Sequence, residues 1–243
     1  MRDQLEKSLS IAWKDIRVYY LKAPNFTYGL LMPLALYLAF SVAGNLKPET
    51  LISGLVSLAI LFGSTSIEAV AVVSERTSGT FERLLVAPIT LRWILFGKAL
   101  AGAAFGPLTA VLALIPVVLI SGTSVANPIL LLVTVGISSF AFACLGILAS
   151  AYSKWIPEAQ MYSNFLRFPM AFLGGAFIPV TSMPPILQLV SRLLPLTYSI
   201  EALNQSMAYT LPTWTYLLDN MLLVIFSAAC LLVAENVLRK RIG

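Results

Sequence analysis

Long apolar stretches alternate with short polar ones along most of the chain. Six of these stretches have the roughly 20 residues that a helix needs to cross the hydrocarbon core of a bilayer. They cover residues 26–44, 51–73, 93–120, 129–151, 159–179 and 217–238. The pattern therefore predicts an all-α integral membrane protein with six transmembrane helices, which together form one transmembrane domain.

The segment before the first span has a helical pattern of its own. Residues 4–22 place apolar side chains at steps of three or four, while Lys7, Lys14 and Arg17 lie on another face. This pattern is typical of an amphipathic helix that lies in the membrane interface. An arm that packs on a partner protein is the alternative.

The segment between the fifth and sixth spans is apolar but rich in proline. Residues 180–203 are too interrupted to form a span, and we expect an external re-entrant hairpin that begins after Pro179. Pro184 and Pro185 indicate a helix start, because proline is tolerated in the first turn. Pro195 is expected to end that helix.

The basic residues orient the spans. With a cytoplasmic N-terminus, nearly all Lys and Arg fall at the inner ends of the spans, and only Lys47 and Arg192 lie outside. The positive-inside rule selects this orientation, and six spans then place the C-terminus in the cytoplasm as well. We expect a multi-pass protein of the cell (plasma) membrane that contacts lipid. Its net charge of +5 serves topology, and we expect no nucleic acid partner.

The composition argues against several kinds of catalytic site. The chain has no His, the commonest general base near neutral pH, and Cys144 and Cys230 both lie in apolar runs. The nearest approach to a phosphate-binding P-loop, RWILFGKA at 92–99, lacks the first glycine and the final Ser or Thr. We expect no catalytic residue, metal or cofactor in this chain, so an ATPase would have to be another protein.

Three charged residues fall inside the spans: Glu68, Lys98 and Arg167. A charge at this depth is costly and usually faces a partner or a wet cavity. We expect Glu68 to pair with Lys98 or Arg167. Alternatively, Lys98 extends to the interface, and Arg167 lines a substrate path.

The stretch between the second and third spans, residues 74–90, gathers charges of both signs. Gly79 is expected to turn the chain, Thr80 to cap a short helix, and Pro88 to end it. Charge complementarity on such a helix can set the register of a docked partner, whereas the alternative is a loop whose charges only set topology. The candidate coupling residues are Glu75, Arg76, Gly79, Thr80, Phe81, Glu82, Arg83, Leu84, Leu85 and Pro88.

This stretch resembles the signature that follows the second span in ABC-2 type transporter permeases. Most of the candidate coupling residues match that signature in order, and Thr77 departs from it, where the family usually has an acid. Residues 174–204 are similar to the family's proline-rich external hairpin. The resemblance implies a half-transporter in which two copies of the chain pair with two separate ABC ATP-binding subunits. Those subunits bind ATP and Mg, and the helix around residues 79–87 couples to them.

The resemblance also implies a function. Members are mostly exporters of drugs, lipids or lipid-linked glycans, so we expect an export permease for an amphipathic or lipid-like substrate that works by alternating access. Two other classes remain open from the residues themselves: a passive channel or ion-coupled carrier, and a membrane assembly protein that transports nothing.

Overall fold

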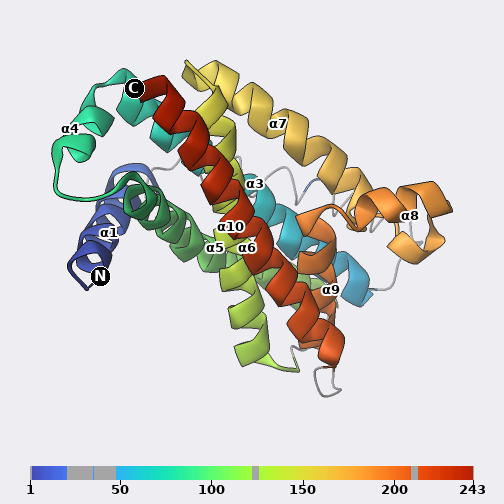
Figure 1. Ribbon diagram of the computed structural model, residues 1–243. Helices are drawn as coiled ribbons and strands as arrows, with labels where there is room; N and C mark the ends of the chain where they lie inside the picture. The colour runs from blue at the N-terminus through green and yellow to red at the C-terminus, as the bar shows by residue number, and fades with distance from the viewer. Residues whose placement is uncertain (1, 21–34, 36–47, 122–125, 209–212, 243) are drawn as a thin grey trace.

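The computed structural model describes residues 2–20, 35, 48–121, 126–208 and 213–242, and these residues form helices joined by short turns (Figure 1). The predicted first span, 26–44, lies outside the described residues apart from residue 35. The helices are α1 (Arg2–Asp15, continued by a π-helical turn, Ile16–Tyr20), α3 (Pro48–Thr77), α4 (Thr80–Val86), α5 (Leu91–Ser121), α6 (Pro128–Tyr152), α7 (Ile156–Leu173), α8 (Pro185–Ser191, after a 3₁₀ turn, Val180–Ser182), α9 (Pro195–Met207) and α10 (Trp214–Ile242).

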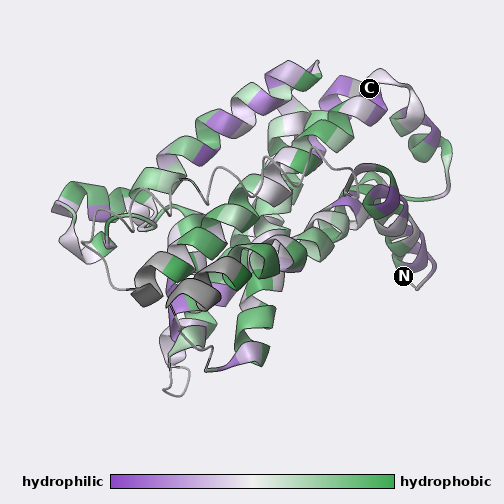
Figure 2. Ribbon diagram, turned by 180° about the vertical axis from the view of Figure 1, so that it is seen from behind, coloured by the Kyte–Doolittle hydropathy of each residue, from purple (hydrophilic) through white to green (hydrophobic). Residues whose placement is uncertain are grey.

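Four described helices are long and apolar enough to cross a membrane. Their spanning segments are Ile52–Thr77, Leu91–Ile115, Pro128–Tyr152 and Trp214–Arg241. They correspond to the predicted second, third, fourth and sixth spans. The hydrophobic colour follows these long helices, whereas hydrophilic residues lie near the chain termini and also along α7 (Figure 2).

The predicted fifth span, 159–179, is only partly helical. Helix α7 ends at Leu173, and the chain then turns at Gly174 and Gly175, where Gly175 has a φ of 93°. Helix α7 is shorter than the four spanning helices. It is also less apolar, because it carries polar side chains such as Gln160 and Asn164.

Helix α3 lies at the centre of the bundle. It packs against α5, α6, α7 and α9, and its span is the most buried of the four, whereas that of α10 is the least buried. Apolar side chains such as Leu58, Ile60 and Leu61 on α3 are almost fully buried. Helices α5, α6, α7 and α9 are therefore arranged around α3, whereas α10 packs mainly on α6 and α9.

The proline-rich segment forms a hairpin of two helices with different surroundings. Most of α9 is buried against α3, α6 and α10, and Ser57 on α3 lies 3.1 Å from Ser199 on α9, Oγ to Oγ. The first helix, α8, begins at Pro185 as expected but ends at Ser191, and Pro195 begins α9 instead of ending α8. Proline suits this first position because its missing N–H has no helical partner there.

The two ends of the bundle carry different elements. Helices α1 and α4 lie at one end with the C-terminal end of α10, and α8 and α9 lie at the other (Figure 1). We call these the α4 end and the α9 end. The candidate coupling residues are at the α4 end.

Candidate functional site

Helix α4 is a two-turn helix that connects α3 to α5. Gly79 reverses the chain with a φ of 69°, a left-handed conformation that glycine adopts without steric cost. Ala87 returns to extended backbone before Pro88, as expected for a residue that precedes proline. The helix therefore lies between Gly79 and Pro88, as predicted. However, Gly79 occupies the N-cap position predicted for Thr80, which is the first helical residue.

Phe81 anchors α4 to the rest of the chain. Its side chain is 2% exposed and packs with Ile11 of α1 and Ile94 of α5. Leu84 and Leu85 are partly buried at the edge of the same cluster. Burial of a phenylalanine side chain contributes about 1.5–3 kcal/mol, so α4 is attached to two other helices and not only to its flanking turns.

The opposite side of α4 is open. Glu82, Arg83 and Val86 are exposed, and Val86 is 87% exposed. We call these three residues the outer face of α4. A short anchored helix that presents two opposite charges around an apolar residue is suited to docking on another protein, where charge pairs set the register.

Helix α1 holds the segment that follows α4. Lys7 Nζ donates to the carbonyl oxygen of Pro88 at 3.1 Å, and Gln4 Nε2 donates to the same oxygen at 3.3 Å. Gln4 Oε1 also accepts a hydrogen bond from the backbone N–H of Thr90 at 3.3 Å. The exit from α4 is thus tied to α1.

Helix α1 in turn packs closely on α5. A Cβ added to Gly97 would lie 2.6 Å from the carbonyl oxygen of Ser8, so only glycine permits this approach. The Ser8 hydroxyl donates to the carbonyl oxygen of Trp93 at 2.7 Å. The predicted amphipathic helix is therefore present and is packed on its own chain. Its other side exposes large apolar residues, Leu5, Leu9 and Trp13, and the prediction that it lies in the interface remains untested.

Four charged side chains from α1, α3 and α5 form a closed ring. Lys98 Nζ lies 2.9 Å from Asp15 Oδ2 and 2.6 Å from Glu75 Oε2. Lys14 Nζ lies 3.0 Å from Asp15 Oδ1 and also pairs with Glu75 Oε1. Charges of opposite sign alternate around this charge ring, so each of the four has two opposite neighbours.

Three of the four side chains in the charge ring are buried. The side chains of Lys98 and Asp15 are 0% exposed, that of Glu75 is 2% exposed, and that of Lys14 is 36% exposed. Isolated charges at such positions would be very costly, and mutual pairing with good geometry offsets that cost. Burial raises the pKa of the adjacent Tyr19 phenol, and the negative charge of Glu75 raises it further. The ring joins α1, α3 and α5.

Two residues predicted as docking contacts face inward. Glu75 belongs to the charge ring because α3 continues to Thr77 and turns this side chain towards α5. Arg76 donates to the carbonyl oxygens of Ser150 and Ser153 at 3.2 Å each. A cation at the C-terminus of α6 satisfies carbonyl groups that have no helical partner. Of the four charged candidates, Glu82 and Arg83 are exposed, Arg76 is half-buried and Glu75 is buried.

The structure also places the charges predicted inside the spans. Lys98 is fully buried, and its direct carboxylate partners are Asp15 and Glu75, while the predicted partner Glu68 acts on its charge from a greater distance. Glu68 is fully buried on α3 and lies beside Gly146 of α6, where an added Cβ would lie 3.1 Å from the Glu68 Cβ.

Arg167 clamps α7 to α3. Its guanidinium donates to the carbonyl oxygen of Phe62 at 3.1 Å and to the Ser66 hydroxyl, both on α3, and to Asn164 Oδ1 on its own helix. It also lies 4.9 Å from the centre of the Phe62 ring, and it is 2% exposed. Arg167 is thus occupied by protein groups in the structure, and the hypothesis that it lines a substrate path gains no support.

Replacing Arg167 with leucine is expected to loosen α7. Hydrogen bonds from a charged donor contribute about 1.5–3 kcal/mol each when their partners stay buried, so we expect a lower thermal unfolding midpoint in mild detergent. Replacing Arg192, which is exposed at the α9 end, with leucine is the control and should change little. Equal midpoints for the two variants would contradict the clamp.

The contribution of α1 to this site does not stand out in the sequence. Asp15 was not singled out, although it follows Ser8, Ile11 and Ala12 at helical steps and shares their buried face. One acid on an otherwise small and apolar face is the signal that points to a buried ion pair. Glu235, which is buried and pairs with Arg92, was missed because it stands near the basic C-terminal turn and resembles a solvated charge.

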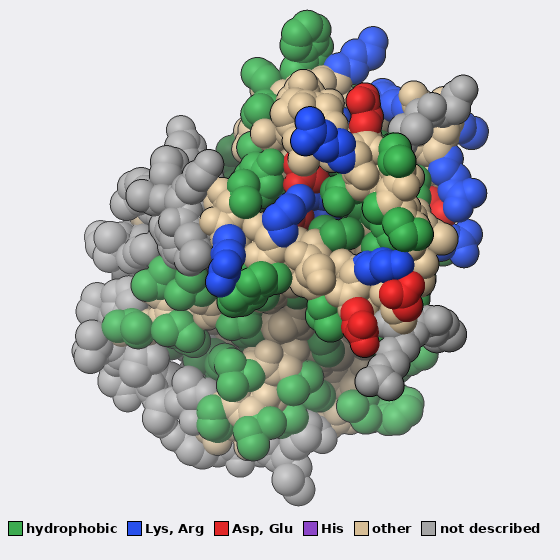
Figure 3. Space-filling view, turned by 90° about the vertical axis from the view of Figure 1, so that its left-hand side faces the viewer, with side chains coloured by type: hydrophobic (Ala, Val, Ile, Leu, Met, Phe, Trp, Pro, Cys, Tyr) green, Lys and Arg blue, Asp and Glu red, His purple; other side chains and the backbone are tan. Residues whose placement is uncertain are grey.

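The surface at the α4 end is rich in basic side chains. Figure 3, which shows this side of the molecule, has Lys and Arg gathered over its upper half among acidic and hydrophobic side chains, whereas the described side chains of its lower half are mainly hydrophobic. Basic residues at one end of apolar helices agree with the charge distribution that the positive-inside rule associates with the cytoplasmic side.

Comparison with known proteins identifies the family. Residues 8–208 match the family of the ABC-2 type transporter. Nodulation protein J of Sinorhizobium fredii is 31% identical over 174 residues, which cover 70% of this chain and 62% of that relative. The inner membrane transport permease YadH of Escherichia coli is 24% identical over 153 residues, 63% of this chain and 60% of that relative. The matches thus span less than two thirds of either relative's length.

The similarity to known proteins and the apolar helices both indicate a location in the membrane. The match to the family covers most of the chain, including α4, the charge ring and the proline-rich hairpin of α8 and α9. The four long apolar helices and the similarity to an inner membrane permease indicate a multi-pass protein of the plasma membrane. The chain belongs to the ABC-2 type transporter family.

Proposed function

We propose that this chain is the permease subunit of an ATP-driven ABC exporter and that the outer face of α4 docks on a separate ATP-binding subunit. The observation that carries the proposal is the geometry of α4, a short helix anchored by buried Phe81 with Glu82 and Arg83 exposed. Two copies of the chain and two ATPase subunits would complete the transporter, and the ATPase would bind ATP and Mg. The α4 end is then cytoplasmic.

The charge ring supports a mechanical role for α4. Helix α4 packs on α1 and α5 through Phe81, and the ring joins both helices to α3, the central helix. A displacement of α4 by the ATPase would therefore be passed to three helices at once. We propose that this linkage converts closure of the ATPase pair into alternating access of the permease pair.

The proposed cargo is an amphipathic or lipid-like molecule that moves outward. Lys98 on α5 and Arg167 on α7, two deeply buried cations, are bound by protein oxygens and are not offered to a small anion. The mostly apolar helices suit an amphiphile better. Stimulation of ATPase activity by amphiphilic drugs, and not by sugars, would support this cargo; the reverse result would contradict it.

Exchanging the two charges on α4 tests the docking. Glu82→Arg combined with Arg83→Glu keeps the net charge of the chain. It reverses the sign of the charge at both positions, so each would face a like charge on the docked partner. Because like charges in contact cost several kcal/mol, we expect at least about a tenfold loss of ATPase co-purified from native membranes in mild detergent. The matched control is Arg192→Glu at the α9 end, and all forms are compared at equal amounts in the membrane.

Two results would contradict the proposal. If the wild-type protein brings down an ATPase and the exchanged variant retains it, the outer face of α4 is not the docking surface. If the wild-type protein brings down no P-loop ATPase, a passive channel, an ion-coupled carrier or an assembly protein becomes the better description. ATP-independent flux in liposomes of the purified chain would then distinguish the first two from the third.

A further inference from the structure

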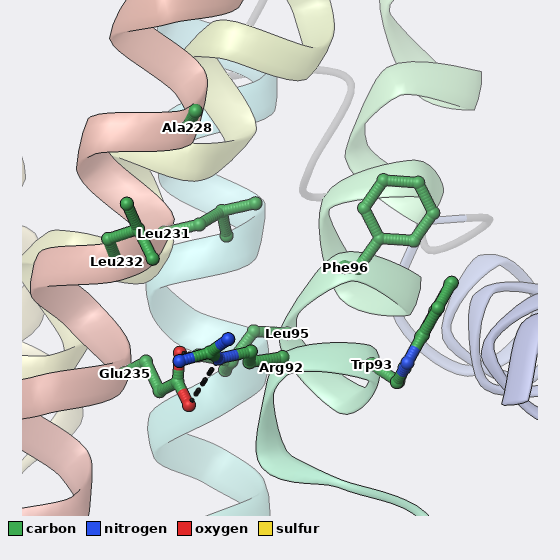
Figure 4. A pocket seen from close by; sticks show the side chains of 8 residues that line it. All are labelled: Arg92, Trp93, Leu95, Phe96, Ala228, Leu231, Leu232 and Glu235. Atoms are coloured by element: carbon green, nitrogen blue, oxygen red, sulfur yellow. Dashed lines mark hydrogen bonds and ion pairs between the residues drawn. The ribbon is translucent and has the colours of Figure 1, made fainter. Parts of the chain in front are cut away.

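A cleft separates α5 from α10 near the α4 end. It has a volume of about 430 Å³, within the range of about 300–1,000 Å³ that is common for ligand pockets. Figure 4 shows Leu95 and Phe96 of α5 on one side and Leu231 and Leu232 of α10 on the other. Its walls are therefore apolar and belong to two membrane-spanning helices.

One end of the cleft is charged. Arg92 reaches across from α5 and donates through Nε to Glu235 Oε1 and Oε2 on α10, at 2.9 and 2.7 Å (Figure 4). Arg239, one turn further along α10, pairs with Glu235 Oε1 at 2.7 Å. The carboxylate is buried, with 3% of its side chain exposed, whereas the side chains of Arg92 and Arg239 are 67% and 59% exposed. Two exposed guanidinium groups thus share one buried carboxylate, which leaves a surplus positive charge at the end of the cleft.

The position of these groups matches the layers of a bilayer. Arg92 is the second residue of α5, and Arg239 is in the last turn of α10, so both lie where the spans leave the hydrocarbon. Trp93, which also lines the cleft, is a residue type enriched at that boundary. A ligand with an anionic head and an apolar tail would meet the two arginines and the apolar walls together.

We propose that this cleft binds an anionic phospholipid from the leaflet on the α4 side, with its phosphate on Arg92 and Arg239 and an acyl chain along Phe96 and Leu231. A basic pocket between membrane helices is suited to an anionic lipid head group. A soluble partner cannot reach the apolar part of the cleft within the span. An apolar helix of a second copy would leave the surplus charge unmatched. This lipid is a resident ligand, and the proposal does not depend on what the protein transports.

Lipid binding to the purified full-length protein tests the proposal. Native mass spectrometry would compare phosphatidylglycerol with phosphatidylcholine at equal concentrations, and we expect the wild-type protein to retain the anionic lipid preferentially. The first variant combines Arg92→Gln, Glu235→Gln and Arg239→Gln, which removes the surplus charge without leaving a buried carboxylate unpaired. Since each basic residue near the membrane surface adds about 1 kcal/mol, we expect about a tenfold or greater loss of that preference.

A second variant tests the apolar part alone. Ala228 is exposed and lines the cleft, so Ala228→Trp would fill the cleft without changing a charge and should also reduce retention of phosphatidylglycerol. The control, Lys154→Gln with Arg192→Gln, removes two exposed positive charges elsewhere on the chain and should retain it.

Three outcomes would overturn the lipid site. They are equal binding of the two lipids by the wild-type protein, unchanged preference in both cleft variants, and cross-linking of a cysteine placed at Leu232 to another protein chain in native membranes. Each readout is independent of ATPase docking, so failure of the lipid site and failure of the proposed transport function are distinguishable.

Discussion

Replacing Lys98 with methionine is expected to lower the free energy of unfolding by about 3–5 kcal/mol, because removing one partner leaves an uncompensated buried charge. Methionine keeps an unbranched chain of similar length, so the change is mainly one of charge. Asp15 and Glu75 would then share Lys14 alone, although both carboxylates are almost completely buried. Equilibrium unfolding in mixed detergent micelles would measure the loss.

Two further variants make this result specific to the charge ring. Lys154→Met removes a positive charge that is exposed and should leave stability within about 0.5 kcal/mol of the wild type. Lys98→Met combined with Asp15→Asn restores a balance of charge around Lys14 and Glu75 and should recover part of the loss. Equal stability of the single and double variants would show that charge balance is not what the ring provides.

Replacing Phe81 with alanine is expected to release α4 while the long helices stay folded. Truncation of a buried phenylalanine typically costs about 3–5 kcal/mol, and here the cost falls on the cluster with Ile11 and Ile94. Hydrogen exchange should therefore accelerate in the amides of residues 80–86 and stay unchanged in the buried part of α6. If the proposed function holds, the same variant should also lose the ATPase.

The matched control is on the same helix. Val86 is 87% exposed, so Val86→Ala shortens an apolar side chain without opening a cavity, and exchange across α4 should stay near that of the wild type. Unchanged exchange in the Phe81→Ala variant would mean that its flanking turns alone hold α4 in place.

The long helices could be predicted because one physical requirement dominates their sequence. A span must be apolar over about 20 residues, and the bounds predicted for α3, α5, α6 and α10 fall within four residues of the observed ones. Helix α4 could also be predicted, because Gly79 allows the turn before it and Pro88 ends it. Helix α7 was predicted too long, because the apolar residues after Leu173 continue the pattern through a turn at Gly174 and Gly175.

The inward direction of Glu75 could not be read from its neighbours in sequence. A charged residue in a charged stretch resembles a surface residue, yet Glu75 lies in the last turn of α3, where one side of the helix faces α5. Its partners are 61 residues earlier, at Lys14, and in another span, at Lys98. Hydrophobic periodicity reports which face of a helix is polar, but it does not report which distant residue meets that face.

The charge ring also constrains the order in which the chain assembles. Helix α1 is synthesised before α3 and α5, but Asp15 is paired with Lys98, which follows 83 residues later. Glu75 and Lys98 reach the membrane with α3 and α5, so α1 can take its final place only after both have been inserted. Until then its acid remains hydrated. Docking of α1 is therefore a late event in biogenesis, and a bulky fusion at the N-terminus should slow maturation after insertion is complete.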